Sequence, residues 1–246
     1  MSNFNYDSPI SGNQSFELSQ VDFNHIMRLV YTWMGLGLLA TAGMAWLAAT
    51  NTALAPLRDS SAVWLITIVL LFGSVIALSA GIRARWMTPN LAMMLFFGFA
   101  LINGFSLSLT FQYFIENEPD AIFSAFGTAS AVFGAMSIYG YTTKADLTGW
   151  GTYLFAGLIG IVAAMVINWF VGSSALSLLI SIGGVIVFTG LTAYDTQKIK
   201  KMSMNPELQS DGNMALKFSV LGALTLYLDF INLFLFLLRL FSGGRR

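Results

Sequence analysis

The sequence contains seven separate runs of predominantly apolar residues, each of about the 20-residue length that a helix needs to cross a bilayer. Short polar segments rich in proline and charge separate the runs, as expected for helices rather than for the alternating strands of a membrane barrel. We therefore predict an all-α integral membrane protein, a bundle of seven transmembrane helices at residues 29–50, 62–82, 90–114, 121–142, 150–171, 175–199 and 215–240.

The composition agrees with this prediction and excludes several kinds of function. Only 10% of the 246 residues are charged, against about 25% in soluble domains. The 12 basic and 12 acidic residues cancel, so no net charge favours nucleic acid, and we expect the lipid bilayer as the surroundings instead. Because cysteine is absent and His25 is the only histidine, we expect no cofactor and no thiolate or histidine metal centre.

The predicted loops differ in charge between the two sides of the bundle. The acidic cluster of residues 116–120 lies on the side opposite the N-terminus, where Arg58 is the only basic loop residue. By the positive-inside rule the N-terminus is cytoplasmic. The basic loop residues on the N-terminal side are Arg83, Arg85, Lys144, Lys200 and Lys201.

We divide the chain into a polar cytoplasmic segment (1–27), a transmembrane domain (28–242) and a short basic tail (243–246). We expect no signal peptide, so that the first spanning helix serves as the insertion signal. The basic tail conflicts with the charge rule, because seven crossings place it outside. Either the last helix crosses against that rule or it is re-entrant, and its length favours crossing.

The last two predicted helices each contain one aspartate, Asp195 and Asp229, inside an apolar run. An ionised carboxylate at mid-membrane costs about 2.5–3.5 kcal/mol on insertion scales, so each needs a structural or functional reason. Antiparallel packing of these helices can bring the two carboxyls to a similar depth. Polar residues that share a helix face with them are Thr192, Thr225 and Asn232.

Two carboxyls in contact in a low-dielectric site would share a proton and so act as a proton sensor. A divalent cation such as calcium could take the place of the proton, with Asp195 and Asp229 as transient ligands. The alternative is that each aspartate bonds a neighbouring Thr, Asn or Arg and thereby only locks helix packing.

Small and polar residues mark further faces of the predicted helices. On the fourth helix a stripe at three- and four-residue spacing predicts a helix interface, with a pore lining as the alternative. We also expect Asn103 on the third helix and Asn168 on the fifth to bond across the bundle. The members of the stripe are Gly127, Ser130, Gly134, Ser137 and Tyr141.

Three segments carry a resemblance to a known family: GAMSIYGYTTKADL at 134–147, GLTAYDTQKI at 190–199 and GALTLYLDFINLF at 222–234. They resemble the Bax-inhibitor (TMBIM) family of membrane proteins, most closely its bacterial inner-membrane branch. The resemblance implies a bacterial inner-membrane location and a last helix that is central, wrapped by the other six.

The resemblance also implies a pH-sensitive calcium leak in which Asp195 and Asp229 form the proton-sharing pair. In that family an arginine near the cytoplasmic end of the second helix can act as a latch on the pair. Arg83 and Arg85 both lie in that region, and Arg83 is our choice because it is nearer the helix. Both are more simply explained as interface anchors that follow the charge rule.

Other functions were weighed against a leak. Intramembrane aspartyl proteases also place Tyr-Asp on one helix and Asp on the next, but their second aspartate follows Gly-x-Gly, whereas Asp229 follows Leu226-Tyr227-Leu228. We therefore expect no enzyme. The main alternative is a regulatory protein that binds and modulates a membrane-bound protease without ion flux. A proton-coupled transporter is a third alternative, weakened by the lack of recognisable broken-helix pairs.

Overall fold

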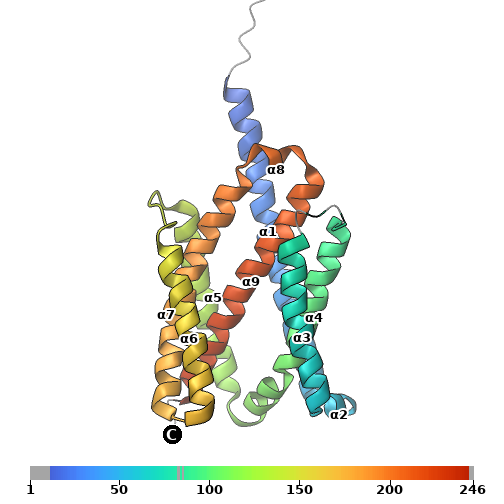
Figure 1. The fold of residues 1–246 in the computed structure, drawn as a ribbon, viewed down its shortest axis with the longest axis vertical. Coiled ribbons are helices and arrows are strands. Elements are labelled where there is room, and N and C mark those ends of the chain that lie inside the picture. Colours follow the sequence, from blue (N-terminus) through green and yellow to red (C-terminus); the bar gives the residue numbers. More distant parts are fainter. Residues whose placement is uncertain (1–11, 82–83, 85, 244–246) are drawn as a thin grey trace, which may run out of the picture.

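The structure, a computed structural model, describes residues 12–81, 84 and 86–243 (Figure 1). Seven helices in this part of the chain are long and apolar enough to cross a membrane, and no strand occurs in it, which confirms the predicted all-α membrane fold. The long helices are α1 (Gly12–Thr50), α3 (Ser61–Gly81), α4 (Pro89–Asn117), α5 (Pro119–Thr142), α6 (Trp150–Val171), α7 (Ser174–Ser203) and α9 (Gly212–Gly243). Short helices connect them: η1 (Thr52–Leu54), α2 (Ala55–Arg58) and α8 (Pro206–Ser210).

Local sequence signals set most of the helix boundaries. Proline opens α4 and α5 at the first helical position, where its missing N–H is not needed. Thr88 and Ser173 cap α4 and α7 by accepting the N–H of the residue three positions on. Gly172 ends α6 with a positive φ of 66°, a conformation that glycine adopts without strain.

The first helix starts earlier than the predicted span. α1 begins at Gly12, and its membrane-competent part begins at Phe23. No glycine or proline occurs between residues 13 and 34, so nothing in the sequence ends the helix there. Ile26 and Met27 are buried, so packing of the bundle begins before residue 28, where we placed the start of the transmembrane domain.

The last helix is the most buried of the seven spans. In its most apolar window 72% of residues are buried, against 6–33% in the other spans. It packs on α1, α4, α5 and α7, whereas α3 packs chiefly on α4, and α6 on α7. A last helix wrapped by all six others therefore stays a prediction.

The same helix also decides how the chain crosses the bundle. α9 is continuous over 32 residues, which corresponds to about 48 Å at 1.5 Å per residue. In Figure 1 the chain enters at one end of the bundle and α9 finishes at the other. The structure thus has the crossing arrangement and not the re-entrant one.

Two glycines allow helix backbones to touch. A Cβ on Gly104 of α4 would collide with the Thr41 carbonyl of α1, and a Cβ on Gly140 of α5 would collide with the Ala193 carbonyl of α7. Close backbone approach of this kind is the usual source of helix association in lipid, where apolar burial contributes little. Gly140 thus fixes α5 directly against the segment of α7 that carries Asp195.

Only one end of the small-residue stripe of α5 lies in a helix interface as predicted, since Ser137 is buried and Tyr141 bonds Asn24 of α1. Gly127 and Ser130 are exposed, and a Cβ on Gly127 or Gly134 would meet nothing within 4 Å. The buried face of α5 is a neighbouring one that repeats every four residues and combines small with aromatic side chains. It consists of Ala121, Ala125, Ala129, Phe133 and Ser137.

We predict that Gly140→Ala destabilises the protein by about 1–3 kcal/mol, the usual range for an overpacked site, because the new Cβ must displace the α7 backbone. Gly127→Ala is the matched control on the same helix, and its open surroundings predict no loss. Thermal unfolding of both variants in detergent checks this. Equal melting temperatures would show that α5 and α7 are not in backbone contact.

Candidate functional site: a cavity with two buried aspartates

The two intramembrane aspartates line one cavity of about 490 Å³ between α6, α7 and α9. Asp195 comes from α7 and Asp229 from α9, and they are 9% and 4% exposed. Their side chains are close enough to interact with each other. Packing of α7 against α9 therefore brings together two acids that are 34 residues apart in the sequence.

One carboxyl oxygen of this pair has no partner. Oδ2 of Asp229 is buried and accepts no hydrogen bond from any residue that the structure describes. Ionised carboxylates offer only acceptor oxygens, so a hydrogen bond between the two side chains requires a proton on one of them. One proton held between the two carboxyl groups would therefore provide the donor that this contact lacks.

The neighbouring polar groups do not supply that missing partner. Thr225 and Asn232 line the same cavity, but the Thr225 hydroxyl donates to Leu221 O (3.1 Å) and the Asn232 amide to Leu228 O (2.8 Å). Both bonds stay within α9. Thr192 is fully buried, donates to Phe188 O (2.8 Å) on its own helix and is not among the residues that line the cavity.

Arg83 and Arg85, the two candidates for the latch, lie outside the described residues. A different basic residue, Lys198, lines the cavity near the polar C-terminal end of α7. Its Nζ lies 5.7 Å from the centre of the Tyr194 ring, and the ring packs over Gly151 of α6. The position of Lys198 three residues after Asp195 puts it on the same helix face, a spacing that the sequence itself shows.

The carboxyl pair provides only part of a metal site. Among the described residues no group of three or more His, Cys, Asp or Glu side chains could hold a metal ion. Calcium takes six to eight oxygen ligands, and two carboxylates supply at most four. The side-chain oxygens of Thr225 and Asn232 are the nearest additional ligands in the cavity. Such a set suits transient binding better than tight binding.

The loop between α5 and α6 is fastened to α7 immediately after Asp195. Gln197 accepts from Leu147 N (2.9 Å) and donates to Ala145 O (2.7 Å). Three residues further on, Lys200 donates to Tyr141 O (2.7 Å). Any displacement of this end of α7 must therefore move the loop with it or break these bonds.

An ion pair completes this fastening. Lys201 Nζ lies 2.5 Å from Asp146 Oδ1. The hydrogen bond from Lys201, together with those from Thr148, holds the pKa of Asp146 well below its usual range. Since this lowers a pKa that is already acidic, Asp146 stays ionised at every physiological pH, and its contribution to stability is lost only in strong acid. A response near neutral pH must come from another group.

A separate polar cluster ties α9 to α1 and α4. The fully buried Tyr227 hydroxyl accepts from Asn103 Nδ2 (2.7 Å) and lies 2.6 Å from Thr41 Oγ1, which in turn lies 2.9 Å from Ala100 O. Each hydroxyl and amide donor named in this cluster has an acceptor. Asn103 thus bonds across the bundle as predicted, whereas Asn168 does not, since its side chain accepts from the nearby Ser173 N (3.0 Å).

We predict that Tyr227→Phe lowers the free energy of unfolding by about 1–3 kcal/mol, because it leaves Asn103 and Thr41 without their buried partner. Tyr139→Phe, at an exposed position on α5, is the control and should change it by less than about 0.5 kcal/mol. Denaturant or thermal unfolding in detergent measures both. Equal effects would contradict the assigned bonds.

These observations define a seven-helix membrane protein with a pair of buried acids facing a cavity. A family model described as "Inhibitor of apoptosis-promoting Bax1" matches residues 23–246, nearly the whole chain. The chain belongs to this Bax-inhibitor family, as the sequence motifs predicted.

Bacterial relatives agree with this assignment. The chain is 47% identical over 221 residues to the "Inner membrane protein YbhL" of Escherichia coli, covering 89% of this chain and 92% of that protein. It is 41% identical to an uncharacterised protein of Borreliella burgdorferi (91% and 93% covered) and 40% identical to one of Deinococcus radiodurans (94% and 95% covered).

Proposed function

We propose that this protein is a pH-sensitive cation leak, with calcium as the permeant ion, controlled by proton sharing between Asp195 and Asp229. The observation that carries the proposal is the buried, unpartnered Oδ2 of Asp229 beside the Asp195 carboxyl. An intramembrane acid left without a partner is costly and is a functional candidate by default. A shared proton removes one of the two charges and satisfies one of the oxygens.

Loss of the proton is the proposed opening step. It places two negative charges side by side at low dielectric, where their repulsion is far stronger than in water. The repulsion acts between α7 and α9, and the bonds of Gln197 transmit a shift of α7 to the α5–α6 loop. A calcium ion that enters the cavity neutralises the pair in place of the proton, so the same two residues serve as gate and as transient site.

The proposed location is the bacterial inner membrane, with the N-terminus in the cytoplasm. The name of the Escherichia coli relative supports the location. The charges support the orientation, because Lys144, Lys200 and Lys201 gather at the end of the bundle where α8 lies. Asp195, which precedes Lys198, Lys200 and Lys201 on α7, then lies toward the cytoplasmic half of the membrane.

The orientation can be tested with single cysteines, since the native chain has none. We predict that Asp120→Cys, exposed at the start of α5, reacts with a membrane-impermeant maleimide in spheroplasts. Asn213→Cys, exposed near the start of α9, should react only after the membrane is opened. The reverse pattern would invert the proposed topology.

Calcium influx into liposomes that contain the purified protein tests the leak. We predict a flux that rises as the pH is raised and the shared proton is lost. Asp195→Asn and Asp229→Asn should each make the flux independent of pH or abolish it, because a neutral amide cannot release the proton. Asp120→Asn, an exposed acid far from the cavity, is the matched control and should behave like wild type.

Two outcomes would overturn the proposal. If both asparagine variants keep the wild-type pH dependence, the pair is not the sensor. If wild-type liposomes carry no more calcium than empty ones at any pH, the protein is no leak, and a regulatory role toward a membrane-bound protease becomes the function to test.

A further inference from the structure

We propose that the seam between α1 and α5 binds one anionic phospholipid, with its phosphate beside Arg28 and an acyl chain in an apolar cavity further along the seam. This site lies apart from the aspartate cavity and does not depend on the proposed leak. Two separate cavities on the same seam, one polar and one apolar, carry the inference.

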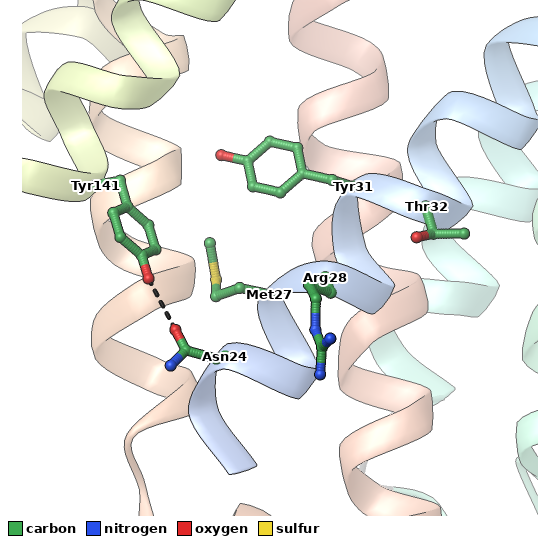
Figure 2. A pocket seen from close by; sticks show the side chains of 6 residues that line it. All are labelled: Asn24, Met27, Arg28, Tyr31, Thr32 and Tyr141. Carbon is green, nitrogen blue, oxygen red and sulfur yellow. Dashed lines mark hydrogen bonds between the residues drawn. The ribbon is translucent and has the colours of Figure 1, made fainter. Parts of the chain in front are cut away.

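The polar cavity, of about 780 Å³, lies where the membrane-competent part of α1 begins (Figure 2). Arg28 lines it and is exposed, and its guanidinium makes no hydrogen bond or ion pair with any described residue. The other lining residues are Asn24, Met27, Tyr31, Thr32 and Tyr141, none of them acidic. A free guanidinium in such surroundings matches a phosphate, which it can bind through two parallel N–H donors.

Further groups favour an anion at this place. Tyr141 donates its hydroxyl to Asn24 Oδ1 (3.0 Å), as Figure 2 shows, which fixes the wall opposite Arg28. Lys200 Nζ lies 4.8 Å from the centre of the Tyr141 ring and adds a second positive charge behind it. Arg28 comes five residues after Phe23, about 7.5 Å along the helix, and tyrosines are typical of this interfacial depth.

The apolar cavity, of about 240 Å³, lies on the same seam. Four helices line it, with Leu38 and Ala42 on α1, Leu107 and Phe111 on α4, Phe126 on α5, and Phe230 and Phe234 on α9. Its one polar lining residue, Thr41, already uses its hydroxyl in the Tyr227 cluster. From Arg28 to Leu38, at the near edge of this cavity, α1 rises about 15 Å, which equals the hydrocarbon half-thickness that an acyl chain descends from the phosphate.

The small residues of α5 connect the two cavities. Ser130 and Gly134 follow Phe126 at four-residue steps, and Tyr141 comes seven residues after Gly134, so all lie on one side of the helix. A Cβ on Gly134 would meet nothing within 4 Å. α1 packs chiefly on α4 and α9, and α5 on α7 and α9, so the surface between α1 and α5 stays open to a lipid chain.

The occupant must have both an anionic group and a long apolar part. A free phosphate would use only the polar cavity and leave the apolar one unexplained. A neutral lipid would use the apolar cavity and leave Arg28 without a counter-charge. An anionic phospholipid such as phosphatidylglycerol satisfies both.

Native mass spectrometry of the purified full chain, titrated with phosphatidylglycerol or with phosphatidylcholine of the same acyl chains, tests the site. We expect one retained phosphatidylglycerol in wild type. Arg28→Gln should weaken that binding by about fivefold, the usual effect of one basic residue near an anionic lipid, and leave phosphatidylcholine unchanged. Ala42→Phe, which fills the apolar cavity, should weaken the binding of both lipids.

Matched controls separate a defined site from general lipid coating. Lys144→Gln removes an exposed charge on the same side of the bundle, and Ala131→Phe adds a ring at an exposed position on α5, so both should bind like wild type. The proposal fails if the controls lose as much lipid as the site variants, or if the site variants lose none. It also fails if glycerophosphate displaces the lipid and Ala42→Phe has no effect, since that result assigns a free-anion site.

Discussion

The absence of water inside a bilayer is the constraint on which the rest of this structure depends. Every polar group within the spans must find its partner in the protein, because an unsatisfied one costs several kcal/mol. Some do so locally, since the side chains of Thr192, Thr225 and Asn232 donate hydrogen bonds to backbone carbonyls of their own helices. The Tyr227 hydroxyl instead bonds two neighbouring helices, through Thr41 and Asn103. Among the described residues four buried side-chain atoms lack a partner, on Trp33, Ser137, Thr196 and Asp229. The oxygen of Asp229 is the one that belongs to an acid, for which a missing partner is most costly.

The parts around the carboxyl pair differ in how firmly they are held. α7 meets α5 in backbone contact at Gly140, and Lys200 bonds the last turn of α5. Gln197 and Lys201 bind the α5–α6 loop. On the side of α6 the pair faces a cavity, lined by Tyr194 and Lys198. A change of charge in the pair therefore acts between one firmly fastened helix and one buried helix, with open space beside them to receive an ion.

The most buried helix, α9, separates the two proposed sites. Asp229 faces the cavity shared with α6 and α7, whereas Phe230 and Phe234 face the seam between α1 and α5. Successive residues of one helix thus contact the proposed ion site and the proposed lipid site. A lipid seated in the seam would lie against the helix that carries half of the carboxyl pair, which gives membrane composition a direct physical contact with that helix.

The sequence by itself determined the seven spans, their approximate ends and the two acids, because bilayer thickness fixes the length of an apolar run and because an aspartate inside such a run is conspicuous. The family motifs around Asp195 and Asp229 also identified the family before any geometry was known. Tertiary structure alone decided which faces meet. The stripe at Gly127, Ser130 and Gly134 has the spacing of a helix interface yet lies open, since small residues permit close approach without requiring it. Which bonds Tyr227 and Gln197 make likewise depended on neighbours distant in sequence. Helix periodicity assigns a residue to a face without saying what that face meets.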